Sequence, residues 1–197
     1  MRFDFDFHTH RLSTPPGSGI VNLPQNVLLS PDSFTPEEGA LYSVGIHPWW
    51  TLSDVTPLLQ GLQQLLPHPQ IVAIGECGFD SLRGALLAEQ EKIFVAQVAL
   101  SEQYRLPLTI HCVRAFDHLL AVHKKLRPSQ RWTIHGFRGK PALAQQLLAA
   151  GFDLSFGLHF NAESLRLVPP ERRHAETDDA LCDIAEVRWL QERALQP

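Results

Sequence analysis

Cysteine, basic charge and long apolar runs are all scarce in this 197-residue sequence, and each shortage argues against a class of protein. Three cysteines, an odd count, argue against a disulfide framework and favour reduced thiols in a cytoplasm. A net charge of −4 leaves no basic field to hold long duplex nucleic acid by its backbone, although a small local patch would still fit. No apolar run approaches membrane-spanning length, and no signal-peptide pattern precedes the first predicted strand. We therefore expect a cytoplasmic protein without membrane contact, and no motif predicts a protein partner.

The remaining composition is that of an ordinary soluble globular protein, because 44% of the residues are hydrophobic and 19% are charged. The length suits a full core, so we predict a single domain over 1–197. Strands are predicted at 3–7, 26–29, 41–46, 71–75, 108–110, 132–134 and 152–156, with a short last strand ending at 176. Helical patterns lie between most of them, around 58–66, 87–104, 116–123 and 143–148, and a last one covers 184–190.

Eight strand candidates, mostly separated by helices, are what a (β/α)8 barrel of the TIM type requires. The segments 71–75, 108–110 and 132–134 are nearly continuous apolar runs, as expected for parallel strands covered by helices. An open doubly wound sheet is the alternative, but no glycine-rich phosphate loop follows the first strand. The segments after the first two strands are too short and too broken by proline and glycine for full helices. We therefore predict a trimmed α/β barrel in which some outer helices are short or missing.

Polar side chains at the ends of these strands form a candidate site. His8 and His10 end the alternating first strand, and their spacing lets both imidazoles turn to one side and converge on one ion. Taken alone, the pair fits a packed or surface histidine equally well. Four more residues follow later strands, and in a barrel the carboxyl ends of all strands meet at one face. The full set is His8, His10, Glu76, His111, His135 and Asp178.

Four imidazoles and two carboxylates suit zinc, manganese or other borderline divalent ions. They are too many for one catalytic ion that keeps an open position, so two ions fit better, with Glu76 as the natural bridge. With two divalent ions and a bridging hydroxide, these ligands would carry a net charge of about +1, which favours an anionic substrate such as a phosphate ester. Asp178 is well placed to accept the proton of the attacking water. We therefore expect Glu76 and Asp178 to be the catalytic residues.

Six short motifs resemble, in order and spacing, the motif set of the TatD-family metal-dependent hydrolases. They are DFHTH at 6–10, GIHP at 45–48, GECGFD at 75–80, IHCVR at 110–114, HGFRG at 135–139 and ETD at 176–178, with Gln90 and Phe94 also similar. The resemblance implies a TIM-type barrel of the amidohydrolase-like group, two divalent metal ions (zinc, manganese or magnesium) and, in studied members, nuclease activity on DNA. It implies one metal on His8, His10, Glu76 and Asp178, and a second metal on Glu76, His111 and His135.

The chain departs from the family's pattern in its short loops, its truncated last helix and Asp179, where members often carry a proline-containing run. Such loops help to build a substrate mouth, so we expect the chemistry to be better preserved than the substrate. His47, Arg114 and Arg138 are candidate substrate-binding residues, because they stand at the same face and a guanidinium can hold a phosphate oxygen bidentately. A packed histidine and surface ion-pair arginines are the alternatives.

Other residues near the motifs have structural interpretations. Cys77 and Cys112 should point away from the site and pack, and Asp80 should steady the loop behind Glu76. Trp49 and Trp50 either cap the barrel with apolar area or offer a stacking surface to bases.

Three functions fit these observations. A metal-dependent phosphodiesterase or nuclease, with DNA as a possible substrate, is favoured by the resemblance. Hydrolysis of a small amide, ester or lactone at the same centre is the first alternative. A catalytically silent metal-binding scaffold is the second, although keeping so many ligand-type residues unpaired and buried without a metal would be costly.

Overall fold

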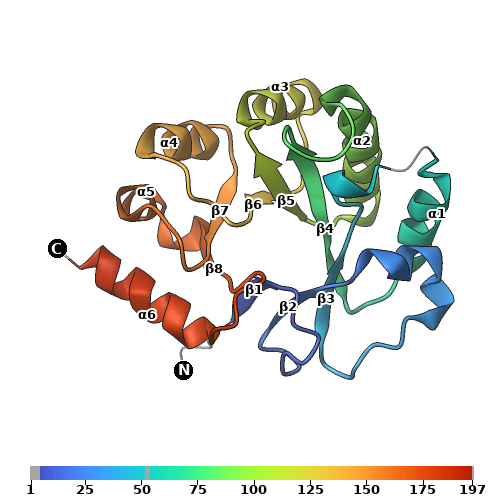
Figure 1. The fold of residues 1–197 in the computed structure, drawn as a ribbon, viewed down its shortest axis with the longest axis horizontal. Coiled ribbons are helices and arrows are strands. Elements are labelled where there is room, and N and C mark those ends of the chain that lie inside the picture. Colours follow the sequence, from blue (N-terminus) through green and yellow to red (C-terminus); the bar gives the residue numbers. More distant parts are fainter. Residues whose placement is uncertain (1–4, 52–53, 197) are drawn as a thin grey trace.

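Eight short parallel strands form one sheet in which neighbours in space are also neighbours in sequence (Figure 1). The computed structural model describes residues 5–51 and 54–196, so Phe3 and Asp4 of the predicted first strand lie outside the described residues. The strands are β1 (Asp6–Thr9), β2 (Gly19–Asn22), β3 (Leu41–Val44), β4 (Ile71–Asp80), β5 (Leu108–Val113), β6 (Trp132–Ile134), β7 (Asp153–Phe156) and β8 (Arg173–Ala175). A parallel bridge between Thr9 and Asp178 brings the two edges of the sheet together. The predicted barrel is therefore confirmed, and it is nearly closed.

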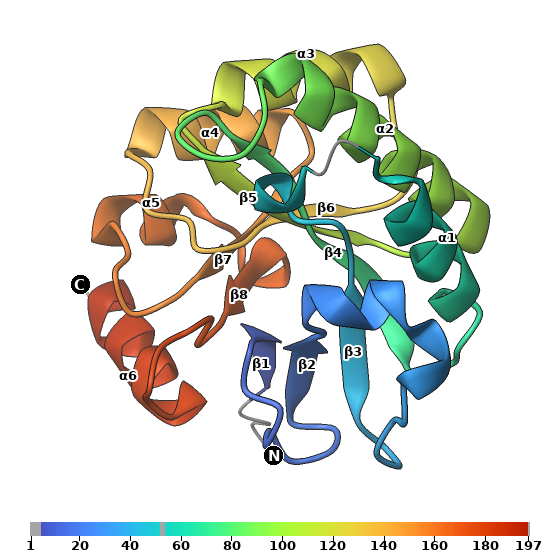
Figure 2. The same ribbon diagram turned by 45° about the vertical axis from the view of Figure 1, so that its right-hand side comes forward.

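The outer ring of helices is incomplete, and it is open beside β1 and β2 (Figure 2). The helices are α1 (Thr56–Leu65), α2 (Leu87–Tyr104), α3 (Phe116–Leu126), α4 (Pro141–Ala149), α5 (Ala162–Leu167) and α6 (Ile184–Leu195). Short 3-10 segments add η1 (Gln25–Leu29), η2 (Pro31–Ser33), η3 (Pro48–Trp50) and η4 (Pro170–Arg172). In the described chain no helix separates β1 from β2, and only η1 and η2 separate β2 from β3. The prediction of a trimmed barrel is confirmed. Among residues 5–51 and 54–196, no helix combines the length and the apolarity that crossing a bilayer requires.

The predicted second strand at 26–29 is wrong. These residues form most of η1, and the strand β2 lies earlier, at Gly19–Asn22. Leu28 of η1 is buried against α1, where the backbone approaches Gly61 so closely that any side chain there would collide with the Leu28 carbonyl. The apolar residues of η1 therefore pack against a helix instead of entering the sheet.

The other predicted elements are present, and two of them match at both ends. Helix α2 spans the predicted 87–104 and strand β6 spans the predicted 132–134. Strands β4 and β5 continue past their predicted ends, to Asp80 and Val113. Helix α5, which has 6 residues, was not predicted, because so short a segment has little periodicity to read.

Helix α2 connects the apolar core to the mouth of the barrel. Its Phe94 ring lies 4.9 Å from the ring of Phe79 in β4 and 5.1 Å from that of Trp132 in β6, measured between centroids. Such aromatic pairs stabilise the core beyond their apolar area. One helical turn further along, the Gln97 amide accepts a hydrogen bond from Ile46 N (2.7 Å) and donates one to Ile46 O (3.1 Å). Because Ile46 follows β3 and precedes His47, α2 fixes the backbone from which His47 projects.

Asp153 anchors the opposite end of the barrel, at the start of β7. Its carboxylate accepts hydrogen bonds from Arg131 Nη1 (3.0 Å) and Arg172 Nε (3.1 Å), and His174 Nε2 lies 3.7 Å away. Burial alone would raise the pKa of Asp153, but hydrogen bonds from His174 and Arg172 and the charge of Arg131 outweigh it and lower the pKa. The carboxylate therefore ties together the amino ends of β6, β7 and β8.

Replacing Asp153 with asparagine should destabilise the fold by about 1–3 kcal/mol at neutral pH, because two arginines lose their buried charged partner. The folded-state pKa lies below the unfolded value, so the stabilisation is complete above the unfolded pKa and is lost as pH falls through the folded pKa. Urea unfolding of the wild type and Asp153→Asn should show a stability gap that narrows in acid. Glu38→Gln, a change at an exposed loop residue, is the control. A gap of equal size at every pH would contradict this role.

Candidate metal centre

Closing the barrel brings three predicted ligands together at the carboxyl ends of the strands. His8 lies in β1, His10 directly follows β1, and Asp178 lies just beyond β8. The backbone N–H of Asp178 donates to His8 O (2.9 Å), and His10 N–H donates to Asp178 O (3.2 Å). The bridge that joins the sheet edges therefore also sets the positions of these side chains. His135, directly after β6, reaches the same mouth.

Glu76 and His111 lie inside β4 and β5, which corrects their predicted place at strand ends. Both strands continue past these residues because their pairing runs on to Asp80 opposite Val113. The register of this pairing shifts between Ile74 and Cys77, so Glu76 lies in a local irregularity of β4. Irregularities of this kind re-aim side chains, and here the carboxylate turns into the mouth.

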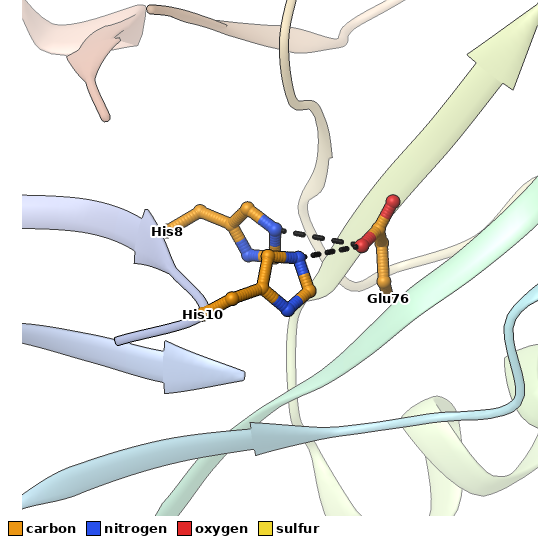
Figure 3. Close-up of side chains that lie close together, drawn as sticks. All are labelled: His8, His10 and Glu76. Atoms are coloured by element: carbon orange, nitrogen blue, oxygen red, sulfur yellow. Dashed lines mark ion pairs between the residues drawn. The ribbon is translucent and has the colours of Figure 1, made fainter. Parts of the chain in front are cut away.

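Glu76 is the centre of the site, and five imidazoles surround its carboxylate. One oxygen, Oε2, faces the first strand and lies 3.3 Å from His10 Nε2 and 3.6 Å from His8 Nε2 (Figure 3). The other oxygen, Oε1, lies 2.7 Å from His135 Nε2, 2.9 Å from His111 Nδ1 and 3.2 Å from His47 Nε2. The two oxygens thus divide the histidines into two groups, which is the arrangement that a bridging carboxylate requires.

The charge of Glu76 is stabilised although the residue is only 6% exposed. Burial would raise the pKa of Glu76, but the charge of His135 and hydrogen bonds from His10, His111 and His135 outweigh it and hold the pKa well below its usual value. Glu76 is therefore ionised at neutral pH, as a metal ligand must be.

His8 provides a test of whether a metal fits. Its side chain is fully buried, and neither ring nitrogen has a hydrogen-bond partner in the described part of the chain. Nε2 lies 3.6 Å from Glu76 Oε2 and 3.8 Å from Asp178 Oδ1, too far for hydrogen bonds. Two ligands of one tetrahedral zinc ion lie about 3.3–3.6 Å apart, because each is about 2.0–2.2 Å from the ion. The distance from the unpartnered imidazole to Glu76 fits this range and the distance to Asp178 slightly exceeds it, so a shared cation needs only a small shift of Asp178.

His10 and Asp178 complete this side of the site, with 3.5 Å between His10 Nε2 and Asp178 Oδ1. The hydrogen bond to Asp178 and then the one to Glu76 raise the pKa of His10 to about 10. Burial would raise the pKa of Asp178, but the hydrogen bond from His10 and the charges of His135 and His8 outweigh it and lower the pKa. Asp178 is therefore a carboxylate at neutral pH, and 30% of its side chain is open to the mouth.

On the other side, two carboxylates outside the predicted ligand set orient the histidines. His135 Nδ1 lies 3.4 Å from Glu176 Oε1, and His111 Nε2 lies 3.3 Å from Asp80 Oδ2. Burial lowers the pKa of His135, but the charge of Glu76 and the nearby Glu176 carboxylate outweigh it and raise the pKa well above its usual value. Carboxylates behind metal-binding histidines fix ring orientation and increase basicity.

His47 has a different role from that of the ligands. Its Nδ1 accepts a hydrogen bond from Trp49 N–H (3.1 Å), so a neutral ring carries its proton on Nε2. Burial lowers the pKa of His47, which keeps the ring neutral at pH 7. Nε2 then donates to Glu76 Oε1, 3.2 Å away. In this tautomer His47 supports the bridging carboxylate from the mouth and has no free lone pair there for a metal.

Within the described residues, four sets of three side chains bring ligand atoms close enough for one ion. They are His8 with His10 and Glu76, His8 with His135 and Asp178, His47 with Glu76 and His111, and His10 with Asp178 and Asp179. Every predicted ligand belongs to at least one set. His47 and Asp179, which were not predicted as ligands, also occur in these sets. His111 and His135 share no set, although both face Glu76 Oε1.

The predicted arginines and cysteines lie around this centre. Arg114 and Arg138 are exposed and line a cavity of about 390 Å³ that adjoins the site. Cys77 is fully buried with its thiol against Thr109 O (3.7 Å), as predicted for a packing residue. Cys112 packs against the core, as predicted. It also borders the cavity of the arginines, so the prediction that it points away from the site is only partly right.

The sequence motifs contain two supporting residues whose roles were missed. Glu176 is fully buried and accepts a hydrogen bond from Gly136 N–H (2.5 Å), beside its contact with His135. Gln90 bonds both N–H and C=O of Asp80, with distances of 2.8 and 2.9 Å, and so fixes the loop after β4. The available signals were a glutamate two residues before Asp178 and a glutamine near the start of the helix 87–104.

Comparison with known proteins places this site in a family. A family model described as "TatD related DNase" matches residues 34–184. The chain is 33% identical over 151 residues to the 3'-5' ssDNA/RNA exonuclease TatD of Klebsiella pneumoniae, covering 71% of this chain and 57% of that protein. It is 34% identical over 146 residues to the human 3'-5' RNA nuclease TATDN2, covering 68% of this chain and 19% of that protein. The chain thus spans about three fifths of the length of the bacterial relatives it matches, 57% and 61% for two of them.

Among solved structures, YJJV, a TatD homologue of Escherichia coli, superposes with a TM-score of 0.74 at 23% identity. The match covers 90% of this chain and 80% of that chain, and it supports the barrel fold alone. The family model covers well over half of the sequence, including Glu76, His111 and His135. The chain therefore belongs to the TatD-related DNase family.

Proposed function

We propose that this chain hydrolyses phosphate esters, and specifically the phosphodiester bonds of single-stranded DNA or RNA, with bound divalent metal ions. One observation carries the proposal: the buried Glu76 carboxylate turns one oxygen to a pair of histidines and the other to a group of three. The relatives support the substrate class, since one is a 3'-5' ssDNA/RNA exonuclease and another a 3'-5' RNA nuclease.

Two ions are part of the proposal, one on each side of Glu76. The first would be held by His8, His10, Asp178 and Glu76 Oε2, and the second by Glu76 Oε1, His111 and His135. The imidazoles favour zinc, and the carboxylates also suit manganese, whereas magnesium prefers oxygen ligands throughout. When bound, such ions polarise a phosphoryl oxygen and lower the pKa of a coordinated water. The two carboxylates offset only part of the ions' charge, so the mouth would attract a phosphate.

Asp178 is the proposed general base. Its lowered pKa keeps it ionised at neutral pH, and its side chain is partly open to the mouth. It can therefore accept the proton that the attacking water loses. Arg114 and Arg138 would hold phosphate oxygens in the adjoining cavity, because both residues are exposed and a guanidinium can form paired hydrogen bonds. His47 would keep Glu76 aligned from the mouth.

We also propose that the chain works in a reducing, cytoplasmic setting. The cysteines Cys77, Cys112 and Cys182 are free thiols. Burial raises the pKa of the Cys112 thiol to about 12, which makes it a poor nucleophile beside the site. These features match a compartment in which thiols stay reduced.

The metal stoichiometry tests the proposed centre. After incubation with zinc or manganese and desalting, the wild-type protein should retain about two ions per chain by mass spectrometry of its metal content. Glu76→Ala should lose most of this metal, because the carboxylate faces both groups of histidines. Glu38→Ala changes an exposed loop residue and should retain the wild-type content. No retention of zinc, manganese or magnesium by the wild type would overturn the hydrolase proposal.

Asp178→Asn should lower hydrolysis of a single-stranded oligonucleotide by about 10²–10⁴-fold, the usual contribution of a general base. The amide keeps the size of the side chain and the backbone bridge to Thr9, so the circular dichroism spectrum should not change. Asp117→Asn, at an exposed position in α3, is the matched control. Turnover of bis-p-nitrophenyl phosphate and of a carboxylic ester should be measured alongside, to separate phosphate from carbonyl substrates. Near-normal activity of Asp178→Asn would remove Asp178 from the mechanism.

Glu176→Gln should weaken metal binding by about 10–100-fold, because His135 loses the carboxylate that orients its ring. The readout is competition for zinc with a chelating dye, which reports affinity directly. Glu171→Gln, at an exposed position in η4, controls for the loss of one negative charge near this segment. If Glu176→Gln binds zinc as tightly as the wild type, Glu176 supports the fold and has no part in holding the metal.

A further inference from the structure

Trp49 and Trp50 form an exposed aromatic rim beside the proposed metal ligands. They belong to η3, which begins directly after His47, and 44% and 51% of their respective surfaces are exposed. Both line a cavity of about 380 Å³ that also contains Glu76 and Asp178. Large aromatic side chains left in water at the mouth of a site commonly mark the place where an apolar part of a ligand binds.

Trp49 is a fixed wall of this cavity. Its indole N–H donates to Asp80 Oδ2 (2.6 Å), and the Arg83 guanidinium lies 3.8 Å from its ring centroid. Its ring meets those of His47 and His111 nearly edge to face, with centroids 4.7 and 5.8 Å apart. A hydrogen bond, a cation over one face and two ring contacts leave little freedom, so the wall is rigid before any substrate arrives. Trp50 is the more exposed of the two, with 51% of its surface open to solvent.

Two cavities meet at the proposed metal ligands, and they differ in chemistry. The first contains the tryptophans together with Leu23 and Pro24. The second, of about 390 Å³, contains Arg114 and Arg138. A nucleotide has an aromatic base with two apolar faces and an anionic phosphate, and these parts match the first and the second cavity. A volume of about 300–400 Å³ lies at the lower end of small-molecule sites and suits a single nucleotide.

We propose that Trp49 and Trp50 form a nucleobase subsite, in which the terminal base of a single-stranded substrate stacks on Trp50 against the wall of Trp49. The phosphates on the 5' side of this 3' terminal nucleotide run along the cavity of Arg114 and Arg138. This inference rests on the proposed function, which it deepens by assigning the recognition of the base. Stacking on tryptophan accepts any base, so the subsite selects nucleotides over other phosphate esters without selecting sequence.

The test uses two trinucleotides that differ only at the 3' terminal residue, which carries either thymine or an abasic tetrahydrofuran. With manganese-loaded wild-type protein, kcat/KM should be about tenfold higher for the base-bearing substrate, which corresponds to about 1.4 kcal/mol. Trp50→Ala should lose this preference by slowing on the base-bearing substrate alone, and Trp50→Phe should retain part of it. Trp189→Ala on α6, where the tryptophan is 53% exposed, is the matched control and should keep the wild-type preference.

Equal rates on both substrates for the wild type, or an equal loss on both for Trp50→Ala, would overturn the subsite. Binding keeps the inference testable if no substrate is hydrolysed. The same two trinucleotides, labelled at the 5' end, would then be titrated by fluorescence anisotropy into manganese-loaded wild-type protein and into its Trp50→Ala variant. If the wild type binds the base-bearing trinucleotide more tightly and the Trp50→Ala variant does not, the subsite is supported even where the proposed hydrolysis fails. Equal affinities with Trp50 present contradict it.

Discussion

The parallel bridge between Thr9 and Asp178 is the contact on which both the barrel and the candidate site depend. Behind it, Asp6 accepts hydrogen bonds from Thr177 N–H (2.9 Å) and from the Thr177 hydroxyl (2.6 Å). Both residues are buried, so these bonds are shielded from competing water and hold the first strand to the chain beyond the last. His8 and Asp178 lie next to the bonds between Asp6 and Thr177. The contacts that close the sheet therefore also bring these two candidate ligands together.

Glu76 imposes the second constraint. An ionised carboxylate that is 6% exposed is costly unless positive charge and hydrogen bonds surround it. Five imidazoles meet that need, and the pKa directions agree: the pKa of Glu76 is lowered, while that of His135 is raised because the nearby carboxylates outweigh its burial. The charge that makes Glu76 unsuited to an apolar interior also makes it suited to join two cations. Fold stability and metal binding therefore draw on the same side chains.

The sequence predicted the barrel and the gathering of the candidate ligand residues for reasons that the structure makes explicit. Apolar periodicity and Pro107 predicted the bounds of α2 correctly. Because parallel strands of a barrel share a direction, residues at their carboxyl ends were expected at one mouth, and His8, His10 and His135 do lie there. Local pattern failed at 26–29, where a short apolar run is equally compatible with a strand and with helix packing. Only the close approach of η1 to α1 decides between them, and this contact is not local in sequence.

Glu176 shows the same limit within the site. Its neighbour Asp178 was predicted from the motif, but the role of Glu176 depends on Gly136 and His135, which lie about forty residues earlier in the chain. The extra length of β4 is likewise decided by pairing with β5, and that pairing cannot be read from either strand alone. The missed features depend on partners that are distant in the sequence, so local sequence patterns could not predict them.

The candidate metal centre keeps its arrangement although outer helices are missing, because its residues lie on the strands or shortly beyond their ends. The segment between β2 and β3 illustrates how little chain is needed. Gln25, at the start of η1, accepts a hydrogen bond from His47 N–H (3.1 Å) and donates to Gly45 O (3.3 Å). Leu23 and Pro24, just before it, line the cavity of the tryptophans. One short segment thus fixes the end of β3 and shapes the mouth, so trimming the barrel alters the opening to substrate while the inner surface keeps its chemistry.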